Sequence, residues 1–381
     1  MSTAFSFMTA TEILFGRGKA ALAADRVVAL GTRVFLLQGQ SGTRADWLAD
    51  ALSAAGATVL RQSVAVEPDL ALIEAATRAA RSFGATVVVS LGGGAAIDAG
   101  KAVAALVPAT RPALDHLEVV GRSLPLDQPP LPFVALPTTA GTGAEVTRNA
   151  VIGVPEHRRK VSLRDPRMLP RLAIIDPALT DGCPRAITLA SGLDAVTQVI
   201  EPYISSRANP MTDALCAAAI PLGLAALHRL MVGEQPQARD DMAFVSLCGG
   251  LALANAGLGV VHGLAGPLGG LSNAPHGAIC GALLPHALLL NRARVTDPQR
   301  RARIDQVLRW IGAAFGVAPD QAAATLALWS RQCGLPGLGA MGISEDDTTA
   351  AAAAAATSSA MQANPVALDQ ADLMRMLQAA F

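Results

Sequence analysis

The chain has 381 residues, of which 51% are hydrophobic and 16% charged, and its 30 basic and 30 acidic residues give a formal net charge of zero. Nucleic-acid-binding proteins carry a basic excess, and single-strand binders need aromatic platforms, but aromatic residues make up only 3% here. We therefore expect no nucleic-acid partner and a protein of roughly two domains that acts on small molecules.

The sequence predicts neither a membrane span nor a secretory signal. Its most apolar stretches, such as residues 282–290 with Pro285 inside, fall short of the ~20 apolar residues that cross a bilayer, and residues 1–11 lack a charged signal pattern. The cysteines are odd in number and never form a C-x-x-C pair, which is typical of reduced thiols: Cys183, Cys216, Cys248, Cys280 and Cys333. A cytoplasmic protein is expected.

The first half of the chain alternates strand and helix patterns, which predicts βαβ units around a parallel sheet. Residues 86–91 are apolar on both faces, as in a buried parallel strand. In chain order the predicted elements are a strand at 34–37, a helix at 45–55, a strand at 58–60, a helix at 68–83, the strand at 86–91, a helix at 95–107 and strands at 133–136 and 172–175.

After residue 176 the composition changes. From Pro184 onward the sequence is rich in Ala and Leu with helical periodicity, and no convincing strand pattern remains. The fold class is therefore an α/β N-terminal domain with a parallel sheet, residues 1–178, followed by an all-α helical C-terminal domain, residues 179–381.

A triple glycine follows the strand at 86–91 and opens the next helix. Gly92, Gly93, Gly94 and Ala95 would present backbone N–H groups and a helix N-terminus to a phosphate. The spacing lacks the third glycine of the usual dinucleotide fingerprint, so a plain strand–helix turn is the alternative. Asp98 could then simply cap the helix start.

A second loop follows the strand at 133–136. It concentrates the hydroxyls of Thr138, Thr139 and Thr142 between glycines, a composition that suits a pyrophosphate or a sugar edge. A helix cap with flexible glycines is the alternative interpretation. Lys160 could add a positive charge, or it could be an ordinary solvated lysine.

The helical half contains residues suited to a metal. Asp194 and Gln198 are four apart and share one helix face, and His262 and His276 lie in Gly- and Pro-rich surroundings. Two imidazoles and a carboxylate are good ligands for a first-row divalent metal. Buried histidines bonded to backbone carbonyls are the alternative.

These signals occur together in an order that resembles the iron-containing (group III) alcohol dehydrogenase superfamily along essentially the whole chain. Ala363-Asn364-Pro365 resembles the family's ending. The other matching segments are residues 13–16, 92–101, 137–147, 174–179, 192–195, 200–203 and 262–277.

The resemblance implies a Rossmann-like dinucleotide-binding domain, a helical metal and substrate domain, and hydride transfer between a small alcohol and NAD or NADP. A divalent metal, Fe or Zn, would bind the substrate oxygen. The implied metal ligands are Asp194, Gln198, His262 and His276, with Asp194, His262 and His276 catalytic. The implied cofactor-binding residues are Gly92, Gly93, Gly94, Ala95, Asp98, Thr138, Thr139, Thr142, Lys160 and Leu179. The family also suggests a homodimer.

The chain departs from the family pattern at several positions. Gln198 stands where the family usually has histidine, and an amide oxygen is a harder, weaker ligand than imidazole. Gly266 replaces a frequent histidine, and Ala95 and Ala144 replace serines. No acid in residues 37–41 is placed to bond a ribose 2′-hydroxyl, so the choice between NAD and NADP stays open.

Three alternatives remain at this stage. A metal-free, maleylacetate-reductase-like ketoacid reductase could use Arg148, Arg158, Arg159 and Arg164. A dehydroquinate-synthase-like lyase needs basic residues near the metal helices, but residues 258–284 contain no Lys or Arg. A non-catalytic nucleotide-binding protein would account for Gln198 and Gly266.

Overall fold

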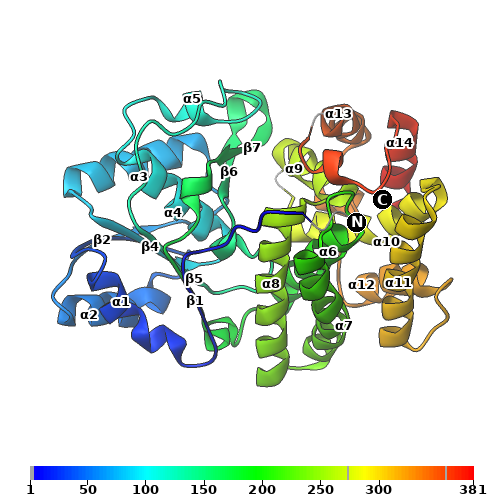
Figure 1. The fold of residues 1–381 in the computed structure, drawn as a ribbon, viewed down its shortest axis with the longest axis horizontal. Coiled ribbons are helices and arrows are strands. Elements are labelled where there is room, and N and C mark those ends of the chain that lie inside the picture. The colour runs from blue at the N-terminus through cyan, green and yellow to red at the C-terminus, as the bar shows by residue number, and fades with distance from the viewer. Residues whose placement is uncertain (1–3, 273, 357) are drawn as a thin grey trace. The chain divides into compact units, whose positions relative to one another are not determined.

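The computed structural model describes residues 4–272, 274–356 and 358–381. It divides into two compact units (Figure 1). The α/β unit comprises Thr9–Thr139 and Gly143–Asp181. The helical unit gathers Ala140–Thr142 and Gly182–Phe381 with the N-terminal segment that ends at Met8.

A six-stranded, all-parallel sheet forms the centre of the α/β unit. Its strands, in spatial order, are β1 (Ile13–Phe15), β8 (Leu172–Ile175), β5 (Phe133–Pro137), β4 (Val87–Gly92), β2 (Arg33–Gln38) and β3 (Thr58–Ser63). The five strands predicted from sequence are all present. The short edge strand β1 is an addition, which pairs with β8 through only three residues.

Alternating side chains of the strands enter two separate cores, because successive residues of a strand face opposite sides of the sheet. In β2, Val34 and Leu36 pack with α1 and α2, whereas Phe35 and Leu37 pack with α3 and α4. Figure 1 shows these helix pairs on opposite faces of the sheet. Their bounds are Ala23–Val28 (α1), Asp46–Ala54 (α2), Leu70–Phe83 (α3) and Gly94–Leu106 (α4), and a short helix α5 covers Ala113–His116.

The strand order reverses direction between β2 and β4. From β2 the chain moves outward to β3, and it then returns to build β4, β5 and β8 on the other side of β2. In open parallel sheets, ligands bind outside the carboxyl ends of the strands at such a switch point. Gly92 is in register with Pro137, so the loops after β4 and β5 are neighbours at this edge.

An antiparallel hairpin follows β5 and was not among the predicted elements. It consists of β6 (Asn149–Val154) and β7 (Arg159–Arg164), and Arg158 adopts a positive φ of 49° at its turn. The basic residues in and before β7 obscure the apolar alternation that usually indicates a strand.

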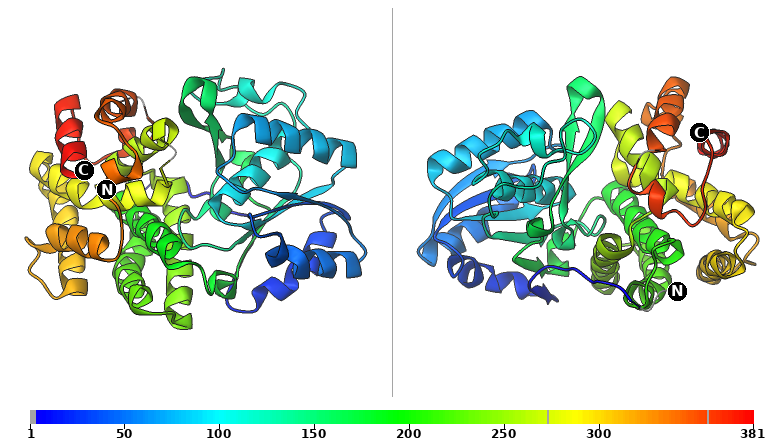
Figure 2. Two further views of the ribbon diagram at one scale, coloured as in Figure 1. Left: turned by 180° about the vertical axis from the view of Figure 1, so that it is seen from behind. Right: turned by 45° about the horizontal axis from the view of Figure 1, so that its top comes forward.

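The helical unit contains the nine remaining α-helices, as far as the structure describes the chain, and shares one apolar core. The long helices α6, α7 and α8 pack against one another, as Figure 2 shows from two further sides. The bounds are Arg185–Ile204 (α6), Pro210–Val232 (α7), Pro236–Ala256 (α8), Val260–Ser272 (α9), His276–Arg294 (α10), Pro298–Phe315 (α11), Ala322–Gln332 (α12), Glu345–Ala355 (α13) and Gln370–Ala379 (α14).

Helix α7 is long and apolar enough to cross a membrane by length and composition alone, a feature that was not predicted from the sequence. Half of the most apolar 18-residue stretch of α7 is buried within the structure. Its most extensive contacts with other helices are with α6, α8 and α11. The apolar composition of α7 therefore agrees with a place in the core of the helical unit.

Candidate active site

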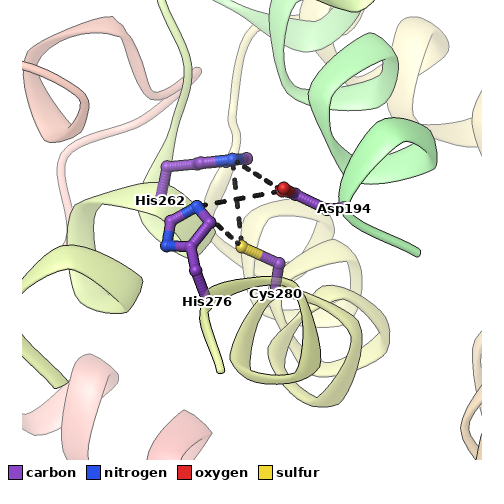
Figure 3. A group of neighbouring side chains, drawn as sticks. All are labelled: Asp194, His262, His276 and Cys280. Carbon is purple, nitrogen blue, oxygen red and sulfur yellow. Dashed lines mark hydrogen bonds and ion pairs between the residues drawn. The ribbon is translucent and has the colours of Figure 1, made fainter. Parts of the chain in front are cut away.

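Four potential metal ligands converge inside the helical unit (Figure 3). Asp194 comes from α6, His262 from α9, and His276 and Cys280 from α10. One donor atom from each side chain lies within 4.8 Å of all the others. His276 and Cys280 are four residues apart on one helix, so both point to the same side.

Two glycines let α10 approach α6 closely enough to bring these groups together. A Cβ at Gly277 would lie 2.4 Å from the carbonyl oxygen of Ala190, and one at Gly281 would lie 2.6 Å from a methyl group of Leu193. Both separations are too short for real contacts, so only glycine fits there. His276 and Cys280 flank these positions and thereby face Asp194.

The donor set suits a divalent cation. Asp194 is buried, and its Oδ1 accepts no hydrogen bond of normal geometry. This oxygen lies 3.3 Å from His262 Nε2 and 3.8 Å from His276 Nε2. A buried carboxylate oxygen without a donor is costly unless a cation compensates it. A carboxylate and imidazole nitrogens are ordinary ligands of Zn²⁺ and Fe²⁺.

Glu201 fixes the orientation of His262. Its Oε2 lies 2.6 Å from His262 Nδ1, and its Oε1 accepts a hydrogen bond from the backbone N–H of Val261 at 2.7 Å. Because a carboxylate can only accept, Nδ1 donates its hydrogen to Glu201, and Nε2 faces the cluster, where its electron pair would be available to a bound metal. Asn364 accepts from Val260 N–H at 3.1 Å, so the C-terminal Asn-Pro segment also holds the start of α9.

The charges around the cluster favour a positively charged group within it. Burial opposes protonation of His276, but the neighbouring Cys280 and Asp194 outweigh it and raise the pKa of His276 to about 9. The pKa of His262 is also raised, although burial opposes this, because Cys280, Asp194 and Glu201 surround it. The pKa of Asp194 is lowered in spite of its burial, since both imidazoles lie beside it. The acidic groups around both imidazoles thus stabilise positive charge at this place, which is also what a bound cation requires.

Gln198, the fourth predicted metal ligand, forms a hydrogen bond to a neighbouring loop. It is buried one turn after Asp194 on α6. Its Nε2 donates a hydrogen bond to the carbonyl oxygen of Thr142, and within the described residues this is the only hydrogen bond of its side chain. The backbone N–H of Gly141 donates to Ser246 Oγ at 3.0 Å. Gln198 and Ser246 therefore secure the 140–142 segment to the helical unit.

The predicted phosphate loops lie together at the carboxyl edge of the sheet. The backbone N–H of Thr138 donates to Gly92 O at 2.9 Å, and the Thr139 hydroxyl lies 3.2 Å from the Cβ that a residue at position 93 would carry. Gly93 is the N-cap of α4, and no side chain caps it. Gly94 and Ala95, in its first turn, are partly exposed, so free N–H groups remain available for a phosphate.

The other predicted cofactor residues lie in different parts of the structure, and some of them are already paired with other side chains or backbone groups. Asp98 does not cap α4, because it lies in the helix and accepts instead from Val151 N–H at 3.1 Å. Lys160, in β7, pairs with Glu67 at 2.5 Å. Leu179 follows β8 in a 3₁₀ turn, Pro177–Thr180, at the same sheet edge as the glycine turn. Thr142 belongs to the helical unit.

Helix α4, which begins at the glycine turn, contains a buried charged residue that was not predicted from the sequence. Lys101 is fully buried, donates to Thr147 Oγ1 at 2.7 Å and pairs with Asp98 at 3.4 Å. Burial lowers the pKa of Lys101 and raises that of Asp98. Burial also raises the pKa of Glu145 to about 7, although Lys101 opposes this shift.

Replacing Glu145 with glutamine is expected to remove a pH dependence of stability. The folded chain retains a proton on Glu145 that the unfolded chain releases above its ordinary pKa of 4.5, so stability falls as pH rises from 4.5 to about 7. Above that window Glu145→Gln should raise the free energy of unfolding by about 1–3 kcal/mol. Urea unfolding of both proteins across this pH range measures the difference.

The exposed Glu156→Gln serves as the matched control, and it should leave the pH slope unchanged. A Glu145→Gln protein with the slope of the original chain would show that Glu145 is ionised in the fold throughout this range.

Comparison with known families decides the ancestry of the chain. Residues 10–177 match the family model "Iron-containing alcohol dehydrogenase", and residues 188–381 match "Fe-containing alcohol dehydrogenase family, C-terminal". The chain belongs to the iron-containing alcohol dehydrogenase family. The resemblance proposed from the glycine turn, the threonine loop and the histidines is confirmed, as is the α/β plus all-α fold class.

Several members of the family are similar over most of their length. Lactaldehyde reductase of Escherichia coli (strain K12) is 33% identical over 328 residues, covering 84% of this chain and 85% of that protein. 1,3-Propanediol dehydrogenase of Klebsiella pneumoniae is 34% identical over 342 residues, with 87% of each covered. A crystal structure of 1,3-propanediol oxidoreductase superposes with a TM-score of 0.88 at 31% identity, covering 99% of this chain and all of that one.

Membership in the iron-containing alcohol dehydrogenase family implies NAD(H) and a metal. The glycine turn and the four-residue cluster are where the sequence and geometry of this member are suited to hold them.

Proposed function

We propose that the protein is an NAD(P)-dependent, metal-assisted alcohol dehydrogenase or aldehyde reductase that acts on small alcohols. The observation that carries this proposal is the convergence of Asp194, His262 and His276, with the orphaned Asp194 oxygen at its centre. The relatives named for lactaldehyde and for 1,3-propanediol support a substrate of about three carbons.

Some side chains of the cluster are suited to bind a metal directly, and another orients one of these ligands. A metal held there would supply Lewis acidity toward the substrate oxygen. Asp194, His262 and His276 would hold it, and Glu201 keeps His262 Nε2 turned toward the cluster. A side chain added at Gly266, one turn after His262, would meet no atom within 4 Å, so this position leaves room for substrate.

The dinucleotide is proposed to bind at the carboxyl edge of the parallel sheet. Gly92–Ala95 would contact the pyrophosphate through backbone N–H groups, with Thr138 and Thr139 beside them. Asp98, Thr142, Lys160 and Leu179 stay predicted contacts of the cofactor. Hydride chemistry belongs to the nicotinamide itself.

The surroundings of β2 favour acceptance of NADP(H). In dinucleotide-binding sheets, an acid at the end of the strand beside the glycine turn bonds the ribose 2′-hydroxyl, whereas an arginine accommodates a 2′-phosphate. Here β2 ends in Gln38, whose Oε1 accepts from Arg61 Nε and Nη2 at 3.0 and 2.9 Å. Arg61 also pairs with Asp46 at 2.8 Å, which keeps its guanidinium at this strand end.

Arg61→Ala is therefore expected to lower kcat/KM for NADPH about tenfold, the equivalent of one charge-assisted hydrogen bond. The value for NADH should change much less, which makes the same variant its own control. Steady-state kinetics with both reduced cofactors measures the effect. Equal losses with NADH and NADPH would remove Arg61 from 2′-phosphate recognition.

The activity itself is tested by following NAD(P)H absorbance with 1,2-propanediol, 1,3-propanediol, lactaldehyde and simple primary alcohols. Turnover with members of this panel supports the proposal. Dinucleotide binding without turnover of any of them would contradict it and favour a non-catalytic binding protein.

The donor cluster favours the metal-dependent activity over a metal-free ketoacid reductase. Of the arginines that such a reductase could use, Arg164 is already paired with Glu118 at 2.8 Å. A homodimer and a cytoplasmic location stay predictions from the sequence.

A further inference from the structure

We infer that Cys280 is the fourth metal ligand of this chain, in place of the residue at position 198, and that the site is built for a thiophilic ion such as Zn²⁺. The inference deepens the proposed function, because it concerns the metal site on which that function rests. It stands on distances, burial and donor chemistry in the helical unit.

The first argument is the spacing of the donor atoms. A tetrahedral ion with bonds of about 2.0–2.3 Å separates its ligand atoms by roughly 3.3–3.8 Å. Cys280 Sγ lies 3.8 Å from His262 Nε2 and 3.7 Å from His276 Nε2. Asp194 Oδ1 lies 3.3 and 3.8 Å from the same two nitrogens. These four separations all match the edges of one coordination tetrahedron (Figure 3).

The second argument is the position of Gln198. Its amide nitrogen donates to the carbonyl oxygen of Thr142, and a carbonyl acceptor allows only the nitrogen, not the amide oxygen, on that side. The side chain thus has a structural task in holding the 140–142 segment. The sulfur of Cys280, one helical turn after His276, is one of four mutually close donor atoms.

The third argument is the environment of the sulfur. A buried cysteine usually behaves as a small apolar residue and packs among apolar groups. Cys280 is fully buried, yet its sulfur faces two imidazole nitrogens and a buried carboxylate that lacks a hydrogen bond. A divalent ion bound by the Asp194 carboxylate and the Cys280 thiolate would have its charge neutralised. A buried site with no net charge avoids the cost of an unpaired charge.

Cobalt substitution tests the inference without relying on turnover. The metal-free protein is titrated with Co²⁺, whose tetrahedral thiolate complexes show an intense sulfur-to-metal charge-transfer band in the near ultraviolet. The original chain and the control Cys333→Ser, a partly exposed cysteine, should both show the band. Cys280→Ser should lose it. Its Zn²⁺ affinity should fall at least about tenfold, since even the loss of a group that only orients a ligand costs that much.

Gln198→Ala separates the two candidate ligands. It should keep the charge-transfer band and the Zn²⁺ affinity, because the amide lies outside the ligand set. X-ray absorption on the zinc-loaded original chain adds a measurement that needs no variant, and one sulfur among the nearest neighbours is expected. Bound Co²⁺ without the band, no sulfur neighbour, or failure to bind either metal would each overturn the inference. Absence of alcohol turnover with the band present would contradict only the proposed function.

Discussion

His262→Ala and His276→Ala are each expected to abolish alcohol turnover while leaving dinucleotide affinity largely unchanged. Each imidazole presents Nε2 to the Asp194 carboxylate, and removing either deletes a ligand from the cluster. Metal ions stabilise developing charge on substrate oxygens by several kcal/mol, so a loss of about a thousandfold or more in kcat is expected. The predicted dinucleotide contacts come mostly from the separate α/β unit, so binding should persist.

The measurement pairs kcat with the dissociation constant of NAD(P)H, obtained by fluorescence titration, and with metal content after dialysis. His157→Ala, which removes an exposed histidine from the β6–β7 hairpin, is the matched control and should retain full activity. If activity survives both cluster substitutions, the metal-centred mechanism is wrong.

Glu201→Gln is expected to have the next largest effect, although Glu201 itself is a positioning residue. The amide can still accept the hydrogen bond from Val261 N–H, but its nitrogen then faces the Nδ1–H of His262. The two N–H groups repel each other, so the ring must rotate or change tautomer. In either case the Nε2 electron pair no longer points toward the cluster. Losses of a carboxylate partner behind a ligating histidine typically cost about 10–100-fold in metal affinity or activity.

The decisive readout is Zn²⁺ affinity set against the thermal stability of the metal-free proteins. A purely structural role for Glu201 would lower the melting temperature and leave Zn²⁺ affinity intact in the folded fraction. The positioning role requires the opposite pattern, a clear loss of affinity with a smaller change in stability. Glu156→Gln should change neither quantity.

The sequence predicts the α/β sheet well where burial imposes a simple pattern. Strands β2, β4 and β5 are apolar on both faces because helices cover both sides of the sheet. Such continuous apolar runs can be recognised in the sequence alone. The edge strand β1 has only three residues, one of them exposed, so it offers almost no pattern. In β7 the basic residues on either side of Val161 and Leu163 hide the alternation, although both apolar side chains are buried.

In the candidate site too, residues with a local sequence signal could be predicted, and residues that depend on distant partners could not. Asp194 and the two histidines stand out because acids and imidazoles are rare in apolar helices. Cys280 did not stand out, since a lone cysteine in a run of Ala, Ile and Leu looks like a core residue. Its spacing of four from His276 was the available signal. Glu201 follows Asp194 by seven residues on the same face of α6, but its partner His262 is 61 residues away.

The path of the chain has a consequence for dissecting the protein into fragments. The backbone passes between the two units after Met8, after Thr139, after Thr142 and after Asp181. A fragment that starts at Gly182 lacks Thr142 and Gly141, which pair with Gln198 and Ser246 inside the helical unit. It also lacks Met8, whose backbone exchanges two hydrogen bonds with Asn255. The C-terminal half expressed alone would lose these contacts, and we therefore expect it to be aggregation-prone.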